Sequence, residues 1–581
     1  MKIRNILMSA ALLGTIASCD MNEVYYSDVL PDNLVHNEQG VFMLLGRAFN
    51  YMEPLRANYI YEVNEQMADV FICPTRVTGA WFEGGIHYNA HYHTVTPDHQ
   101  YSLNWWDNVT TGIANCVDCI DKIKALDYRS LGIPEERRSL HIAQAEALMA
   151  YFYLRGMDWF GGLPIYESQN DPLQPRATMK ATFEKTESLI KSAMANLENR
   201  KTVDQFMDGY FRKGAAAMLL AQLYFNAEYY IGVPMYNEAA KVCEDVINGV
   251  YGPYELDAEW QTPFGFDNHL SHENMWSVVL DGIHLLNNRY TNFFPSKIAN
   301  YFGIKTGYGG GANQWCLAPS RNPEGKLYKE VNPEIRLGSP YEKFDDGDLR
   351  KQLYHYNGNR KYDGMFLVGE LSDPRYPERV CVGTFPLTMG KPLVINDWIA
   401  PYSKLVENGG TIATKAELPS TMENCAEEGD GVRIIKYAVP DEADNALYMT
   451  QDHPVIRLAE AYYTLAECKM RTGDKKGAAE LINAVRKRNF ENGNDPNPVT
   501  EANLDKWRML DEWLIEFLGE GRRRIDLVRW GVYHTEKWWD HEPTNDVKTM
   551  RLPIPTSAFS ANALLKQNPG YGGNELAPEE M

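Results

Sequence analysis

Two stretches of the chain combine flat aromatic rings with amide side chains. One covers residues 81–108 (WFEGGIHYNAHYHTVTPDHQYSLNWWDN), and the other joins 287–294 (NNRYTNFF) to 308–315 (YGGGANQW). A sugar ring has an apolar face of C–H groups and a rim of hydroxyls, so aromatic rings flanked by amides suit it. Each aromatic side chain could instead pack its own loop against neighbouring helices, and residue type does not separate these two roles. The candidate ligand-binding residues are Trp81, Tyr88, Asn89, Tyr92, Tyr290, Tyr308, Asn313 and Trp315.

Three histidines in the first stretch raise the question of a metal. His87, His91 and His93 fall within seven residues, but they lack the helical HExxH spacing of a zinc site. Loop histidines beside tyrosines serve equally well as hydrogen-bonding partners. The segment FDDGDLR at 344–350 lacks the twelve-residue pattern of a calcium loop and predicts a turn that enters a helix. The sequence therefore predicts no metal site and no cofactor.

Hydrolysis is the alternative chemistry for a sugar site. A glycoside hydrolase needs two carboxylates about 5 Å or about 6.5–9.5 Å apart across a cleft. The aromatic stretches contain only Glu83, Asp98 and Asp107 as acids, and no pair stands out. We therefore predict a glycan-binding protein without catalytic residues. The first alternative is binding of a peptide or another nutrient by the same scaffold, and a glycoside hydrolase is the less favoured one.

Helical periodicity predicts the elements that hold these stretches. Residues 453–489 read as two helices, with TGD at 472–474 ending the first and capping the second. The length of this hairpin, about 34 residues, is that of one tetratricopeptide unit. Further helices are predicted within 214–249, 143–164, 181–199 and 105–126, the last with Trp106 on its apolar stripe, so that Trp105 and Trp106 are expected in the core. The fold class is therefore mainly α, with stacked helix pairs.

Periodicity is lost between residues 251 and 430, where Gly, Pro, Asn and aromatic residues dominate. We predict a single domain over 19–581, with a helical scaffold at about 34–250 and 431–581. The part at 251–430 is a loop-rich insertion, and such an insertion is a usual place for a ligand-binding surface.

The N-terminus has the pattern of an export signal. Lys2 and Arg4 precede an apolar run that ends in small residues before Cys19, so residues 1–18 are expected to be removed. No later stretch has 18 consecutive apolar residues.

The formal charge of −21 argues against a nucleic-acid partner. Cys116 and Cys119 are the one close cysteine pair and are expected to be buried thiols.

Six segments together resemble the SusD/RagB family of outer-membrane lipoproteins. They are IASC, AQAEALMAYFYLRGMDWFGGLPIY, KGAAAMLLAQLYFNAEYY, PVIRLAEAYYTLAECKMRTGDKKGAAELINAVRKR, DEWLIEFLGEGRRRIDLVRWG and LPIPTSAFSANALLKQNPGY. The resemblance implies a right-handed scaffold of tetratricopeptide-like pairs and a non-catalytic lipoprotein of the cell surface. It would be anchored to the outer membrane through lipid on Cys19, which agrees with the affinity of multiply acylated proteins for bilayers.

The resemblance also implies a role and partners. Family members capture oligosaccharides and deliver them to a SusC-like TonB-dependent outer-membrane barrel, and some relatives handle peptides or other nutrients. Related proteins place ligand-stacking aromatics in loops near the two stretches named above. The segment 519–531 (GEGRRRIDLVRWG) is structural in the family, and here acids and arginines alternate at helical offsets that favour internal ion pairs.

Overall fold

The computed structural model describes residues 35–52, 62–75, 83–280, 315–371, 393–399, 426, 429–437, 451–577 and 580. Cys19 and four of the candidate ligand-binding residues, namely Trp81, Tyr290, Tyr308 and Asn313, lie outside these ranges. Tyr88, Asn89, Tyr92 and Trp315 lie within them.

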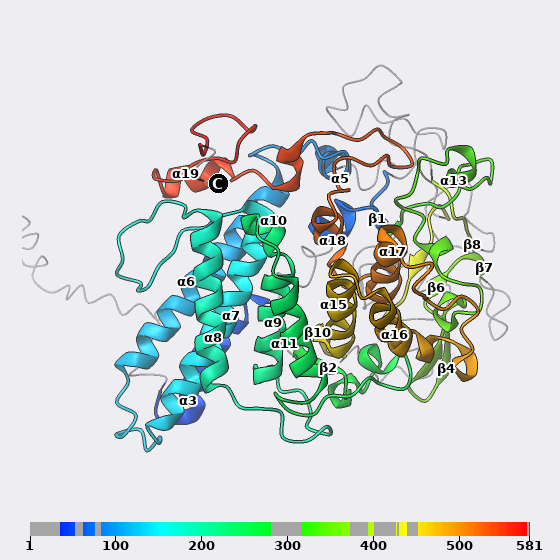
Figure 1. The fold of residues 1–581 in the computed structure, drawn as a ribbon. Coiled ribbons are helices and arrows are strands. Elements are labelled where there is room, and N and C mark those ends of the chain that lie inside the picture. The colour runs from blue at the N-terminus through cyan, green and yellow to red at the C-terminus, as the bar shows by residue number, and fades with distance from the viewer. Residues whose placement is uncertain are drawn as a thin grey trace, which may run out of the picture.

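Antiparallel helices form the body of the protein (Figure 1). The larger helices are α3 (Glu38–Phe49), α6 (Gln100–Ala125), α7 (Glu136–Phe160), α8 (Met179–Asn196), α9 (Lys213–Phe225), α11 (Tyr236–Ile247), α15 (Leu458–Arg471), α16 (Lys475–Arg486) and α17 (Lys506–Phe517). They are joined by the shorter α5 (Ile86–His91), α10 (Ala227–Ile231), α18 (Arg523–Arg529) and α19 (Thr556–Ala561). Helices pack in the order α6, α7, α8, α9, α11, α15 and α16, so one row continues from the N-terminal part into the C-terminal part. The fold is mainly α, as predicted.

Small residues allow the helices of this row to approach closely. Gly112 of α6 faces the ring of Phe152 on α7, and a Cβ atom at residue 112 would lie 2.6 Å from that ring. On α9, Ala215, Ala216 and Ala217 are fully buried. Replacing such residues with larger ones would push neighbouring helices apart.

The predicted hairpin at 453–489 is confirmed in its second half and wrong at its start. Asp474 caps α16 by accepting a hydrogen bond from the backbone N–H of Gly477 at 2.8 Å. However, residues 453–457 form strand β10 (His453–Arg457), which pairs antiparallel with β2 (Asn274–Val278), and the helix begins only at Leu458. The apolar spacing around Val455 fits both a helix and a strand, and the distant partner β2 decides between them.

The loop expected at 81–104 is also partly helical. Helix α5 occupies residues 86–91, and α6 begins at Gln100 instead of near Trp105. The imidazole of His99 caps α6 by accepting from the backbone N–H of Tyr101 at 3.1 Å. Histidine is outside the usual set of capping residues, so the sequence carries no standard signal for this start.

The described part of 251–430 contains short elements with little helix. Its strands are β2, β3 (Cys316–Leu317), β4 (His355–Gly358), β5 (Lys361–Asp363), β6 (Phe366–Leu367), β7 (Gly369–Leu371) and β8 (Leu393–Ile395), and its α-helix is α13 (Tyr328–Val331). Two-stranded antiparallel ladders join β4 to β5 and β7 to β8, while β6 pairs with β9 (Arg433–Ile434) and β3 with β1 (Phe71–Ile72). Strands β4 and β6–β8 and helix α13 lie beside α16 and α17 at one end of the helical row, whereas β2 lies next to β10 (Figure 1).

Single-turn helices connect the larger elements. They are the π-helix η2 (Glu62–Gln66) and the 3₁₀-helices η3 (Glu83–Gly85), η4 (Thr262–Phe264), η5 (Asn268–Leu270), η7 (Tyr341–Lys343), η8 (Leu349–Lys351), η11 (Lys487–Asn489), η12 (Glu491–Gly493) and η13 (Val547–Met550). The FDDGDLR segment enters η8, where the carboxylate of Asp348 accepts from the backbone N–H of Arg350 at 2.9 Å. The predicted turn into a helix is confirmed there.

Ion pairs inside the protein hold the segment 519–531, as predicted. Arg522 pairs with Asp526 one turn later at 3.0 Å. The other partners lie far away in the sequence: Arg523 pairs with Asp69 at 2.7 Å, and Arg529 pairs with Glu467 of α15 at 2.9 Å. These pairs fix α18 against both the start of the described chain and the helical row.

The described cysteines are buried. Cys116 and Cys119 lie on the buried face of α6, as expected, and burial raises the pKa of both thiols. In the described ranges, no helix combines the length and the apolar character that crossing a bilayer requires.

Candidate functional site

Helix α5 presents two of the candidate tyrosines side by side. Tyr88 and Tyr92 are four residues apart, so they lie on one face of the helix. Their ring centroids are 4.7 Å apart with planes tilted by 35°, and both side chains are half-buried. Burial and the charge of Asp540 raise the pKa of Tyr88, which keeps its hydroxyl protonated as a hydrogen-bond donor. The pair offers aromatic surface and hydroxyls together.

Asn89 lies beside this pair and helps to end the helix. Its side-chain oxygen accepts a hydrogen bond from the hydroxyl of Thr94 at 3.0 Å, and its backbone carbonyl accepts from the N–H of Thr94 at 2.8 Å. His93, with φ of 55°, lies in the left-handed region that reverses the chain after α5. The amide of Asn89 is therefore held in a fixed position next to the tyrosines.

Trp315 lies beneath α5. Only 4% of its surface is exposed, and its ring meets the imidazole of His87 edge-on at 5.4 Å. The two aromatic stretches identified in the sequence therefore do come together here. A ligand would reach the ring of Trp315 only after a rearrangement of the residues that cover it.

Two of the three histidines act as hydrogen-bonding partners, as expected. The Nδ1 atom of His87 is 2.9 Å from the hydroxyl oxygen of Tyr101, and burial lowers the pKa of His87 to about 3. The Nε2 atom of His93 is 3.0 Å from the carbonyl oxygen of Met67, and its ring stacks on Tyr533 at 4.6 Å. Burial lowers the pKa of His93 as well, so both imidazoles are neutral near pH 7.

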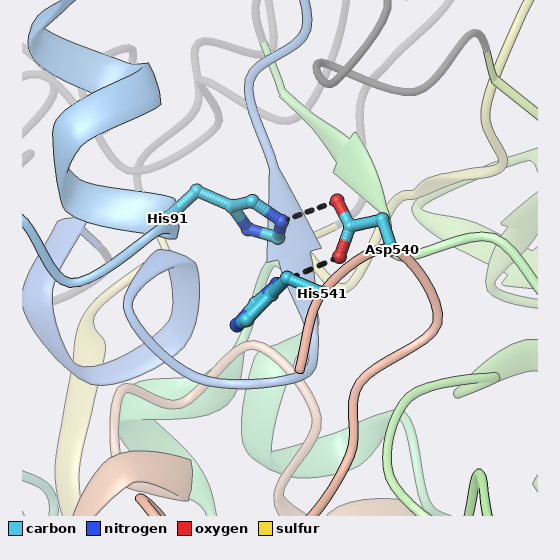
Figure 2. Close-up of side chains that lie close together, drawn as sticks. All are labelled: His91, Asp540 and His541. Atoms are coloured by element: carbon cyan, nitrogen blue, oxygen red, sulfur yellow. Dashed lines mark hydrogen bonds and ion pairs between the residues drawn. The ribbon is translucent and has the colours of Figure 1, made fainter. Parts of the chain in front are cut away.

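The third histidine, His91, contacts the segment that follows α18. Its Nε2 atom is 2.8 Å from Oδ2 of Asp540, and the Nδ1 atom of His541 is 2.9 Å from Oδ1 of the same carboxylate (Figure 2). The hydroxyl of Tyr92 also donates to Oδ2 of Asp540 at 3.3 Å. Donor atoms of His91, Asp540 and His541 lie within 4.8 Å of one another. The sequence prediction of no metal site considered only spacing within single short segments, so it missed this grouping.

The electrostatics of this cluster follow from its burial. Burial alone would raise the pKa of Asp540, but the imidazoles of His91 and His541 outweigh it and hold that pKa well below its usual range. Burial lowers the pKa of His541. Near pH 7 the cluster therefore holds an ionised carboxylate beside a neutral imidazole of His541.

A groove of about 770 Å³ lies between α6, the segment 163–173 and α19. Trp106 lines it, although its indole is 5% exposed and packs edge-on against Phe160 at 5.3 Å, so its expected place in the core is confirmed. Asp107 stands at the wall of the groove, and partial burial raises the pKa of its carboxyl group. The other lining residues include Leu103, Thr110, Leu163, Tyr166, Gln169, Leu173, Asn562 and Leu565. No local sequence pattern indicates this groove, because its walls come from three separate segments of the chain.

A row of antiparallel helix pairs with an insertion of short strands defines the class of SusD-like proteins, and known proteins agree with this assignment. The sequence model of the SusD family matches residues 286–571. The starch-binding protein SusD of Bacteroides thetaiotaomicron is 26% identical over 450 residues, which are 74% of this chain and 72% of that protein.

Solved structures show the same fold. The surface glycan-binding protein A from Bacteroides fluxus superposes with a TM-score of 0.63 at 19% identity, covering 92% of this chain and 100% of that chain. A SusD superfamily protein from Bacteroides fragilis superposes with a TM-score of 0.65 at 18% identity, covering 92% and 99%. Residues 286–571 therefore match the SusD family in sequence, and the fold is similar to that of solved SusD superfamily structures.

Proposed function

We propose that this protein binds glycans at the cell surface and delivers oligosaccharides to a TonB-dependent transporter of the outer membrane. The observation that carries the proposal is the similarity to the starch-binding protein SusD over 74% of the chain. The Tyr88–Tyr92 pair on α5 supports it, because paired aromatic rings with hydroxyls at their edges suit the C–H faces and hydroxyls of a sugar.

The proposed binding surface surrounds α5. Tyr88 and Tyr92 would contact sugar rings, and Asn89 would donate a hydrogen bond to a sugar hydroxyl. Trp315 lies directly beneath and supports the helix through His87. The remaining proposed ligand residues, from the two aromatic stretches, are Trp81, Tyr290, Tyr308 and Asn313.

Isothermal titration of the purified protein with a panel of oligosaccharides tests this site. Loss of one stacking ring removes about 1–2 kcal/mol of binding free energy, so Tyr88→Ala and Tyr92→Ala are each expected to weaken binding about 5- to 30-fold. Phe206→Ala is the matched control, because Phe206 is an aromatic side chain that is 63% exposed elsewhere on the surface. Unchanged affinity in both tyrosine variants would contradict the site, and binding only to peptides would contradict the ligand class.

The proposal that this protein does not act as an enzyme is tested in the same assays. The purified protein should release no reducing sugar from any glycan that it binds. If release occurred and Glu83→Gln abolished it, the protein would be a glycoside hydrolase instead.

Attachment to the membrane is proposed to depend on Cys19. Acyl chains on this cysteine would hold the protein at the outer membrane, since each buried methylene contributes about 0.8 kcal/mol. Cys19→Ala should move the protein from the membrane fraction to the soluble fraction. A SusC-like barrel should co-purify with the unaltered protein from solubilised outer membranes.

A further inference from the structure

We propose that His91, Asp540 and His541 form a binding site for a divalent transition metal of the zinc type. Figure 2 shows the two imidazoles approaching the same carboxylate from α5 and from the segment after α18. The Nε2 atom of His91 lies 2.8 Å from Oδ2 of Asp540, and the Nδ1 atom of His541 lies 2.9 Å from Oδ1. Two imidazole nitrogens and a carboxylate are a common ligand set for Zn²⁺.

The distances are close to those that a metal requires. Zn²⁺ binds nitrogen and oxygen at about 2.0–2.2 Å, so neighbouring ligands of a tetrahedral ion are about 3.3–3.5 Å apart. One ligand atom from each of the three side chains lies within 4.8 Å of the other two. Each imidazole nitrogen is also less than 3 Å from one carboxylate oxygen, His91 from Oδ2 and His541 from Oδ1. Side-chain adjustments of about 1 Å would therefore admit the ion.

The charges of the cluster also suit a cation. Asp540 is ionised and its side chain is 1% exposed, so a negative charge lies inside the protein. In the metal-free state the imidazoles satisfy this carboxylate by donating N–H groups. On binding, the metal would take the place of these two hydrogens, and each metal-bound imidazole would carry its proton on the other ring nitrogen, the form in which histidine binds a metal.

Aromatic packing holds the ligands in place. The ring of His541 lies 4.9 Å from that of Trp538, and the ring of His91 lies 5.1 Å from that of Trp539. Both tryptophans are buried, so they restrict the orientations of the two imidazoles.

The cluster is also accessible from one side. The side chain of His541 is 11% exposed, and the neighbouring Tyr92 is half-buried. The phenol oxygen of Tyr92, 3.3 Å from Oδ2 of Asp540, or a water molecule could take the fourth position of the ion. An ion can therefore enter without unfolding of the core, as a binding site requires.

The test uses tag-free full-length protein treated with EDTA and then dialysed, with ZnCl₂ alone as the probe. Isothermal titration should show one saturable site, and the unfolding temperature should rise with Zn²⁺ but not with equal Mg²⁺. His541→Gln and Asp540→Asn should each weaken this binding at least tenfold. His272→Gln is the matched control, because His272 forms an exposed pair with Asp204 at 3.1 Å, and the described residues supply no third ligand there.

X-ray absorption of the zinc complex of the unaltered protein gives an answer that does not depend on how the variants fold. It should show two imidazole ligands. The proposal is overturned if no saturable Zn²⁺ binding occurs, if both folded variants bind as tightly as the unaltered protein, or if the spectrum shows no histidine. None of these outcomes depends on glycan binding, so the metal site and the proposed function can each be disproved without the other.

Discussion

Two of the buried carboxylates, Glu516 and Asp540, differ in the basic side chains that surround them. Glu516 of α17 lies among the guanidinium groups of Arg350 at 2.9 Å, Arg488 at 2.8 Å and Arg457 at 3.3 Å. Asp540 instead lies between two imidazoles. A guanidinium stays charged at every pH at which the protein folds, whereas an imidazole can be neutral near pH 7. The first arrangement can only hold the fold together, and the second can also exchange its hydrogens for an ion.

The largest expected change in stability is that caused by a substitution at Glu516. Glu516→Gln removes a buried carboxylate that three guanidinium groups share with Asp348, Glu273 and Glu520, and it leaves an excess positive charge inside the protein. The free energy of unfolding should therefore fall by about 3–5 kcal/mol. Urea unfolding followed by circular dichroism measures it. Asp245→Asn is the control, since the pair of Asp245 with Lys241 is at the surface and should change stability by about 0.5 kcal/mol or less. An equal loss in both variants would remove the distinction between the buried network and a surface pair.

The two regions should lose stability in different pH ranges. Burial raises the pKa of Glu516, but the guanidinium charges outweigh it and lower that pKa from 4.5 to about 2. The contribution of Glu516 to stability is therefore present above pH 4.5 and is lost as the pH falls toward 2.

Histidines with lowered pKa values lose their contribution to stability at a higher pH. His87 titrates at about 6.5 in the unfolded chain and at about 3 in the fold, so its contribution is complete above pH 6.5 and declines below it.

Each histidine whose pKa is lowered in the fold reduces the free energy of unfolding by about 1.4 kcal/mol for every pH unit below 6.5, until the pH reaches its pKa in the fold. The free energy of unfolding should therefore decline between pH 6.5 and 5, before the Glu516 network begins to titrate. In His87→Gln this decline should be shallower, while the decline below pH 4.5 should be unchanged. Identical slopes for the variant and the unaltered protein between pH 6.5 and 5 would contradict the assignment.

Asp540→Asn should reduce the free energy of unfolding by less than Glu516→Gln does. An asparagine can accept from one imidazole and donate to the other, because a neutral imidazole offers an acceptor nitrogen when its proton moves. The expected loss is about 1–2 kcal/mol, close to that of one or two hydrogen bonds. A loss as large as that of Glu516→Gln would mean that both imidazoles are charged in the fold.

The smallest effect is expected at Tyr92. Tyr92→Phe removes the hydroxyl that donates to Asp540 at 3.3 Å but keeps the ring against Tyr88. Stability should fall by about 0.5–1.5 kcal/mol, as for one hydrogen bond. Tyr88→Phe is the control, because Tyr88 lies on the same face of α5. Comparing the thermal unfolding of the two variants shows whether the hydrogen bond to Asp540 contributes to stability. A loss of more than about 3 kcal/mol would indicate that the ring had shifted too.

The sequence predicted most of the scaffold, because helical periodicity and caps are local. The cap of α16 by Asp474 was visible in a three-residue motif, whereas the strand at 453–457 depended on β2, far away in the chain. The site was harder to predict for the same reason. Tyr88 and Tyr92 share a helix face that the spacing could have shown, had α5 been recognised. His91 and Asp540 are 449 residues apart, and no local pattern joins them.

The β2–β10 ladder has a consequence for how such a protein can change. Val278 and His453 are paired across the ladder, so the chain departs from the helical row and returns to it at neighbouring backbone positions. The row itself continues through the contact of α11 with α15. Changes of length between residues 279 and 452 therefore leave these two attachment points in place, provided that Arg350 keeps its pair with Glu516 and β3 keeps its pairing with β1.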